Sequence, residues 1–234
     1  MHSKYLKWKR LIDFTLSAIG IPLLIIPIII ISIAIKIDSP GPVFFKQRRV
    51  GTDKKSFYIL KFRTMDINTP FNIPTEMLED ADKYITRVGG FLRKTSLDEI
   101  PQIFNIFLGH MSIVGPRPAL WNQYKLIYLR DKCNANSVRP GLTGWAQING
   151  RDTLTIKEKV AFDGEYIKKM SFSFDLYCFF KTIVKVIKRE DIVEGRVERV
   201  EIQHNEPVTL HHNTSTTEML STTELITEML TKEI

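Results

Sequence analysis

The chain contains one long uncharged segment near its amino terminus. From Phe14 to Ile35, 22 consecutive residues carry no charge, and most of them are Leu or Ile. At helical rise, this length reaches about 30 Å, the thickness of the hydrocarbon layer of a bilayer. Pro22 and Pro27 lie inside the segment, and each removes a backbone donor and clashes with the preceding turn. The pattern therefore predicts a membrane helix that is broken in its middle.

Basic residues flank this segment on both sides. They are Lys4, Lys7, Lys9 and Arg10 before it, and Lys36, Lys46, Arg48, Arg49, Lys54 and Lys55 after it. Because basic flanks favour the cytosolic side of a membrane, both ends are predicted to lie on the same side. A re-entrant helix that enters one leaflet, breaks at Pro27 and returns satisfies both flanks, provided that the freed backbone groups find partners. An ordinary single span stays open as the alternative.

Two extended segments are predicted after a turn cluster at residues 38–42. They cover residues 43–45 and 56–65, and the second is rich in aromatic and apolar side chains, which favours a strand. On a strand, Lys61 and Arg63 lie two positions apart and face the same side.

Two helices are predicted at residues 156–170 and 172–188. The second alternates Phe, Ile and Val with Lys181, Lys185 and Lys188, a cationic amphipathic pattern. Such a helix either lies in the headgroup plane or packs on a core with a solvated lysine face. Both readings stay open.

The predicted fold class is a helix-rich α/β protein. It consists of a membrane segment at residues 1–37, a small catalytic domain facing the cytosol at residues 38–200, and a low-complexity Thr/Glu tail at residues 201–234. The membrane segment is expected to be a re-entrant helix-break-helix, accompanied by interfacial amphipathic helices. It is expected to stay attached, since it is long for a signal peptide and is followed by Lys36.

The charge balance favours anionic partners. The net charge is +7, but the last 34 residues hold six glutamates and one lysine, so residues 1–200 carry +12. Phospholipid headgroups and nucleotide-like substrates fit such a body, whereas no recognisable nucleic-acid-binding module accompanies the charge. Cys133 and Cys178 have neither paired spacing nor a nearby His cluster, so no disulfide framework or zinc site is predicted.

An adjacent carboxylate pair, Asp98-Glu99, opens an apolar stretch in residues 95–105. Two negative charges suit a site that holds a metal ion together with an anionic phosphorus centre. Ser96 and Glu99 also fit a capping box at a helix start, which needs no function. A cap does not require Asp98, however, and Pro101 makes the first turn irregular.

Arginines and glycines cluster further along the chain. Arg117 lies between Pro116 and Pro118, and residues 139–151 hold three glycines and two arginines. Glycine allows close approach of the backbone to a ligand, and arginine binds phosphate well. Taken alone, the glycine-rich segment is a weak signal.

Five short motifs follow one another along the chain. They are Ser-Pro-Gly-Pro-Val-Phe-Phe-Lys-Gln-Arg-Arg-Val-Gly from Ser39, Lys61-Phe62-Arg63-Thr64-Met65, Leu97-Asp98-Glu99, Gly115-Pro116-Arg117-Pro118, and Arg139-Pro140-Gly141 through Arg151. In this order they closely resemble the bacterial sugar transferases, the monotopic polyprenyl-phosphate phosphoglycosyl transferases, over roughly residues 5–190. Small members of that family often have Ser before the break proline, whereas Ile26 precedes Pro27 here.

The resemblance implies transfer of a sugar 1-phosphate from a UDP-sugar to undecaprenyl (polyprenyl) phosphate, with release of UMP. This is the first membrane step in the assembly of exopolysaccharide, capsule or glycoprotein glycans. It assigns the nucleophile, which forms a covalent phosphosugar intermediate, to Asp98. Glu99 and Mg²⁺, the latter held beside Asp98, assist. The residues expected to bind the substrate or its phosphates are Lys61, Arg63, Arg117, Arg139, Gln147 and Arg151.

The implied partners are the UDP-sugar donor, the polyprenyl phosphate acceptor, the membrane, and later glycosyltransferases of the same pathway. The implied location is the cytoplasmic membrane of a bacterium. Two other classes stay open: a membrane-tethered basic binding or scaffold protein, and a UDP-sugar pyrophosphohydrolase that uses the same carboxylates on water.

Overall fold

Helices make up most of the residues that the computed structural model describes, which are 3–70, 81–150 and 153–188. All of them belong to one unit, Met1–Arg196. The tail predicted from residue 201 and the candidate Arg151 lie outside the described residues. The helices are α1 (Ser3–Asp38), α2 (Ala81–Tyr84), α3 (Arg87–Lys94), α4 (Gln102–Phe107), α5 (Tyr124–Asp131), α6 (Trp145–Ile148), α7 (Ile156–Lys169) and α8 (Phe172–Lys188).

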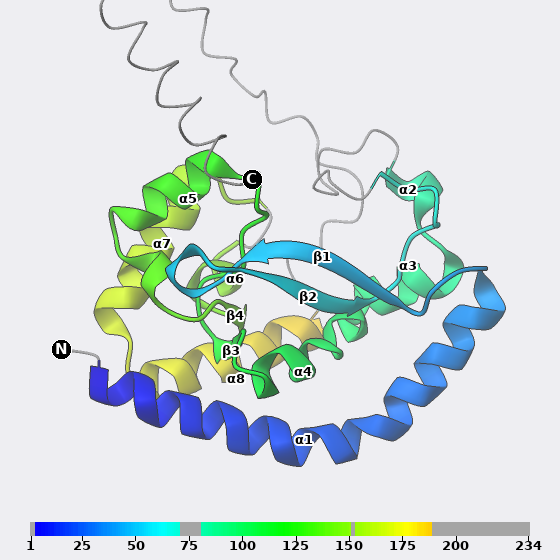
Figure 1. Cartoon of the computed structure of the whole chain (residues 1–234), viewed down its shortest axis with the longest axis horizontal. Helices are drawn as coiled ribbons and strands as arrows, with labels where there is room; N and C mark the ends of the chain where they lie inside the picture. The colour runs from blue at the N-terminus through cyan, green and yellow to red at the C-terminus, as the bar shows by residue number, and fades with distance from the viewer. Residues whose placement is uncertain (1–2, 71–80, 151–152, 189–234) are drawn as a thin grey trace, which may run out of the picture. The chain divides into compact units, whose positions relative to one another are not determined.

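The predicted break in the membrane segment is a bend in one continuous helix. Helix α1 runs for 36 residues with Pro22 and Pro27 inside it. Figure 1 shows α1 (blue) along the base of the unit, bent in its middle part, which is where the two prolines lie. A proline inside a helix removes one backbone hydrogen bond and bends the helix without ending it. The expectation of a helix-break-helix was wrong in this respect.

Both ends of α1 are attached to the same body. Near its start, Asp13 accepts hydrogen bonds from the Ser112 hydroxyl and the Ile113 amide, at 2.7 and 3.1 Å. Near its end, Ile28 and Ile35 are buried in one apolar cluster with Phe62 and Leu92 of the body. Helix α1 therefore lies along the catalytic unit instead of projecting away from it.

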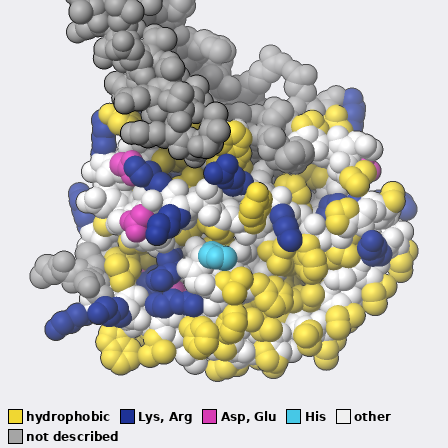
Figure 2. Space-filling model, in the orientation of Figure 1, with side chains coloured by type: hydrophobic (Ala, Val, Ile, Leu, Met, Phe, Trp, Pro, Cys, Tyr) yellow, Lys and Arg dark blue, Asp and Glu magenta, His cyan; other side chains and the backbone are white. Residues whose placement is uncertain are grey.

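The outer face of α1 is apolar and exposed. Among the described residues, α1 is the one helix long and apolar enough to cross a membrane, and only 6% of its most apolar window is buried. Figure 2 shows the hydrophobic side chains as a continuous band along the lower edge of the molecule, where Figure 1 places α1. This surface is suited to lipid, as the sequence predicts.

Within the described residues, four short strands form two separate two-stranded sheets. Strands β1 (Phe44–Val50) and β2 (Ser56–Phe62) pair antiparallel, so the prediction of short strands within residues 43–65 is confirmed. Strands β3 (Ser112–Val114) and β4 (Gly141–Thr143) pair in parallel and were not predicted. At three residues each, they are too short to show an alternating pattern.

The two predicted carboxyl-terminal helices are confirmed as α7 and α8. A capping box starts α7, where Thr155 and Glu158 exchange side-chain to backbone hydrogen bonds. On α8, Cys178 is buried in an apolar cluster with Tyr166 of α7, whereas Phe180 and Ile187 are 56% and 75% exposed. One face of α8 thus packs on the core, and another presents apolar side chains to the outside.

Candidate functional site

Asp98 and Glu99 lie on a single 3-10 turn, η3 (Leu97–Glu99), directly before α4. Ser96 precedes this turn in the left-handed conformation, with a φ of 55°, and its side chain makes no cap hydrogen bond. The capping box considered for Ser96 and Glu99 therefore does not form. Leu97 and Ile100, on either side of the carboxylates, pack against the apolar cluster that contains Ile28 and Ile35 of α1. The apolar helix α1 thus supports the turn that carries the acidic pair.

Strand β2 brings Lys61 to the carboxylates. The Lys61 ammonium nitrogen lies 2.7 Å from Glu99 Oε1 and 3.5 Å from Asp98 Oδ2. The buried Asn105 of α4 fixes this arrangement, since its Oδ1 accepts from Leu60 N at 2.9 Å and its Nδ2 donates to Tyr58 O at 2.8 Å. An amide side chain therefore joins α4, which follows the carboxylates, to the edge of the strand that carries the lysine.

The segment from Gly115 to Pro118 brings Arg117 to the same pair. Arg117 Nη1 lies 3.5 Å from Glu99 Oε1, and the Arg117 carbonyl accepts from Arg130 Nη1 at 2.9 Å. The backbone at Gly115 touches the backbone at Gly144 so closely that a β-carbon on Gly144 would lie 2.0 Å from Gly115 O. Glycine is required there for contact between two chain segments, and not for contact with a ligand.

The four side chains form a partly desolvated group of two anions and two cations. Asp98, Glu99 and Lys61 retain 14%, 11% and 18% of their side-chain exposure, and Arg117 retains 32%. Partial burial strengthens the attraction between opposite charges. It also strengthens the repulsion between the two neighbouring carboxylates, which the two cations offset. The arrangement can present an ionised carboxylate to an anionic substrate while cations beside it offset the repulsion.

The other candidates are placed differently. The buried Arg63 donates from all three guanidinium nitrogens to the carbonyls of residues 39, 40 and 42, so it holds the turn after α1. Arg139 donates from Nε to Gly109 O at 2.9 Å, at the other end of α4 from the carboxylates. Phosphate binding by Arg63 and Arg139 stays a prediction, but the structure gives their side chains these other contacts.

Buried polar atoms without partners mark three further side chains around the site. Within the described part of the chain, Arg93 Nη1, Gln102 Nε2 and both polar atoms of the Gln147 amide have no hydrogen-bond partner. Such atoms cost about 1–3 kcal/mol each unless a ligand or water satisfies them. Gln147 was predicted as a binding residue, whereas Arg93 and Gln102 were missed. Gln102 is a polar residue inside the apolar stretch at residues 95–105, whereas Arg93 precedes that stretch.

The carboxylate pair fits the expected magnesium ion in part. Mg²⁺ in phosphate-transfer sites is commonly bound by one or two carboxylates together with substrate phosphates. Asp98 and Glu99 supply that number, and none of the described residues forms a group of three or more His, Cys, Asp or Glu that could hold a metal alone. The donor set therefore suits an ion that is bound together with the substrate.

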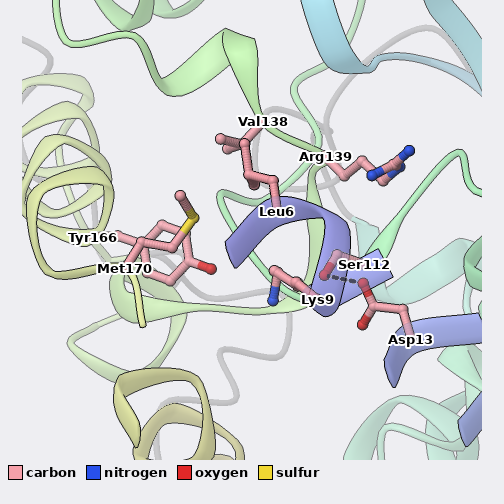
Figure 3. A pocket seen from close by; sticks show the side chains of 8 residues that line it. All are labelled: Leu6, Lys9, Asp13, Ser112, Val138, Arg139, Tyr166 and Met170. Atoms are coloured by element: carbon pink, nitrogen blue, oxygen red, sulfur yellow. Dashed lines mark hydrogen bonds between the residues drawn. The ribbon is translucent and has the colours of Figure 1, made fainter. Parts of the chain in front are cut away.

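A second polar group lies around a small cavity between α1 and the body. Figure 3 shows Lys9 and Asp13 on the α1 ribbon, with Ser112, Tyr166 and Met170 around them. Lys9 pairs with the buried Asp175, which also accepts from the Tyr166 hydroxyl at 2.8 Å. These side chains hydrogen-bond and pair with one another, so the group anchors the first turns of α1 to the body.

Comparison with known proteins adds a family. The sequence model of one protein family matches residues 4–189 of this chain. That family is described as "Bacterial sugar transferase". The UDP-glucose:undecaprenyl-phosphate glucose-1-phosphate transferase of Escherichia coli (strain K12) is 45% identical over 186 residues, which cover 76% of this chain and 39% of that protein.

Two further relatives differ in their length and in the sugar that their names specify. The uncharacterized sugar transferase EpsL of Bacillus subtilis (strain 168) is 39% identical over 79% of this chain and 89% of its own length. A UDP-N-acetylgalactosamine-undecaprenyl-phosphate N-acetylgalactosaminephosphotransferase of Aeromonas hydrophila is 37% identical over 76% of this chain and 43% of its own length. The chain thus spans about two fifths of the E. coli and Aeromonas relatives and most of EpsL.

Proposed function

The chain belongs to the bacterial sugar transferase family, and from this premise we propose that it moves a sugar 1-phosphate from a UDP-sugar to undecaprenyl phosphate. The observation that carries the proposal is the placement of Asp98 and Glu99 between Lys61 and Arg117, on a turn packed against the apolar helix α1. A phosphate-transfer centre that receives both a soluble donor and a lipid acceptor needs this combination of charge and membrane contact.

The first half of the reaction uses Asp98 as the nucleophile. A carboxylate oxygen of Asp98 attacks the phosphorus that bears the sugar, and the bond from that phosphorus to the bridging oxygen breaks. UMP leaves with the bridging oxygen and its electron pair, and a sugar-phosphoryl ester remains on Asp98. Lys61 and Arg117 lie where they can offset the repulsion between the carboxylates and the diphosphate.

The second half regenerates the carboxylate. A phosphate oxygen of undecaprenyl phosphate attacks the same phosphorus, the acyl-phosphate bond to Asp98 breaks, and a polyprenyl-diphosphate sugar is released. Mg²⁺ held by Asp98, Glu99 and the donor phosphates would supply further neutralisation of charge on the diphosphate. Covalent catalysis lets donor and acceptor use one site in turn.

The re-entrant topology is part of the proposal. Asp13 and Ile35, near opposite ends of α1, both bind the same body, so a helix that crossed the bilayer would have to carry part of that body with it. The bend in the part of α1 that contains the prolines allows the helix to dip into one leaflet and return. The exposed apolar face of α8 would lie at the surface of the same leaflet, and the body would face the cytosol.

Incubation with a panel of UDP-sugars tests the activity. With Mg²⁺ and undecaprenyl phosphate, at least one of the donors UDP-glucose, UDP-galactose, UDP-N-acetylglucosamine and UDP-N-acetylgalactosamine is expected to release UMP. Release should rise and saturate with the lipid acceptor, because the acceptor regenerates the enzyme. Steady UMP release without any lipid would identify a pyrophosphohydrolase, and no release with any donor would favour a binding protein.

Cysteine labelling in sealed vesicles tests the topology. In a background with Cys133→Ser, single variants Lys4→Cys and Lys54→Cys are expected to react with an impermeant maleimide from the same side. Cys178 can stay, since it is fully buried and burial raises the pKa of its thiol to about 12, which leaves it protonated and unreactive at pH 7. Labelling of the two positions from opposite sides would rule out the re-entrant form.

A further inference from the structure

We propose that Arg10 and Arg139 form a binding site for the phosphate of a glycerophospholipid headgroup, beside the carboxyl end of α4. The two arginines come from α1 and from the segment before β4, and they meet at Gly109. Arg139 Nε donates to Gly109 O at 2.9 Å, and a β-carbon on Gly109 would lie 3.2 Å from both Cζ and Nη2 of Arg10. Two like charges are thus held side by side.

Most of the donors of this pair have no partner among the described protein groups. Arg10 gives one hydrogen bond from Nη1 to Ile106 O and one from Nη2 to Phe107 O, at 2.7 and 2.8 Å. With Gly109 O, three carbonyls use three of the ten N–H groups that two guanidiniums carry. These bonds fix the positions of both planes and leave further N–H groups for an anion. Guanidinium groups held in a fixed orientation commonly bind phosphate in proteins.

The Asp13 carboxylate attracts Arg10 electrostatically, but its oxygens are hydrogen-bonded to the body. Asp13, one turn along α1 from Arg10, accepts from Ser112 and Ile113 within the described body. Figure 3 shows Asp13 bonded to Ser112 inside the cavity region, while the Arg139 guanidinium points away from that cavity. Arg139 lines the cavity, but its guanidinium therefore points away from the anchoring group.

Aromatic and exposed apolar side chains surround the arginine pair, a combination suited to the boundary between lipid and water. The Arg10 guanidinium carbon lies 5.6 Å from the centre of the Phe14 ring, which stacks on Phe107 at 5.0 Å. Leu108, next to Gly109, is 65% exposed. On the face that Figure 2 draws, lysine and arginine side chains lie above the hydrophobic band. A phosphate bound there would have its acyl chains beside exposed apolar residues.

The position distinguishes this phosphate from the one that reacts. The six residues of α4 lie between Glu99 and Gly109, and at helical rise they span about 9 Å. The carboxylates precede α4 and the arginine pair follows it, so one phosphate cannot touch both. A phospholipid held at the far end of α4 would fix the depth of the carboxylate turn in the headgroup layer. This role rests on the proposed membrane placement of α1 and not on the transfer chemistry.

Titration with a short-chain lipid tests the site. The purified full-length protein in neutral detergent is mixed with dihexanoyl phosphatidylglycerol below its critical micelle concentration, and native mass spectrometry counts the bound lipids. One lipid is expected to bind saturably. The double variant Arg10→Gln/Arg139→Gln should bind it about tenfold more weakly or worse, the factor that corresponds to losing one charge-assisted hydrogen bond.

Controls separate this site from general charge and from the reaction. Lys125→Gln/Lys157→Gln removes the same charge from exposed positions on α5 and α7 and should change the affinity less than twofold. Asp98→Asn should bind the lipid as the native protein does, even if the transferase proposal fails. If the glutamine variant does not fold, Arg10→Lys/Arg139→Lys keeps both charges, loses the planar forks and should still weaken binding.

Three results would overturn the proposal. The first is no saturable lipid adduct on the native protein, and the second is equal affinity in the native protein and the arginine variants. The third is displacement of the short-chain lipid by equimolar undecaprenyl phosphate, which would assign the arginine pair to the acceptor.

Discussion

Replacing Asp98 by asparagine is expected to abolish transfer, with a loss of turnover of about 10⁴-fold or more, as is typical when a covalent nucleophile is removed. The amide has almost the same shape but does not attack phosphorus, so the sugar-phosphoryl ester cannot form. Because the amide fills the same space and Lys61 keeps its closer partner, Glu99 Oε1 at 2.7 Å, the variant should still fold and stay membrane-bound. Only the chemistry is expected to change.

Mass spectrometry provides the direct measurement. Native protein given the donor alone should gain the mass of one sugar phosphate, located on the peptide that contains Asp98, whereas Asp98→Asn should gain nothing. Asp82→Asn removes an exposed carboxylate from α2 and should leave both the adduct and the turnover unchanged. Full turnover in Asp98→Asn, with no adduct on the native protein, would exclude the covalent mechanism and favour the scaffold interpretation.

Replacing Asp163 by alanine is expected to lower the free energy of unfolding by about 3–5 kcal/mol, because it leaves a buried guanidinium without its partner. Asp163 Oδ2 lies 2.7 Å from both Nε and Nη2 of Arg130, and the two side chains retain 1% and 5% exposure. Arg130 also holds the Arg117 carbonyl. The loss should therefore reduce activity as well as stability.

The thermal midpoint of the protein in detergent measures this effect. A shift of about 10 °C or more is expected, given the usual relation between stability and midpoint for a unit of this size. The double variant Arg130→Met/Asp163→Leu should recover part of it, since removing both charges costs less than stranding one. Asp131→Ala breaks an exposed pair with Lys54 and should shift the midpoint little. Equal shifts for Asp163→Ala and Asp131→Ala would contradict the argument.

The sequence predicted the elements whose patterns are local. The alternation in residues 172–188 gave α8 its bounds, and the aromatic run at residues 56–65 gave β2, because packing on one face repeats with a fixed period along each element. Strands β3 and β4 form only through pairing between distant segments, so nothing local identified them. The capping box failed at Ser96 because this residue adopts the left-handed conformation and its N–H donates to Arg93 O, whereas Thr155 is extended and forms the box.

Some of the side chains that the motifs suggested lie together in the structure, and others do not. The structure brings Lys61 and Arg117 to Asp98 and Glu99, as the motifs suggest. Arg63 and Arg139 have the same chemistry but are directed at backbone carbonyls, a choice that depends on the packing of distant chain segments. Residue type indicates what a side chain can bind, while the fold decides which acceptor it meets.

Helix α1 both supports the turn that carries the carboxylates and exposes an apolar surface. These two roles together bear on when a new chain becomes active. Ile28 and Ile35 complete the packing under the turn that carries Asp98 and Glu99. The same helix exposes a large apolar surface whose contact with water is unfavourable. In the proposed function, a newly made chain that has not reached its bilayer would therefore lack the support that aligns Asp98. In the proposed function, the ability to consume nucleotide sugar would therefore be acquired together with delivery to the lipid.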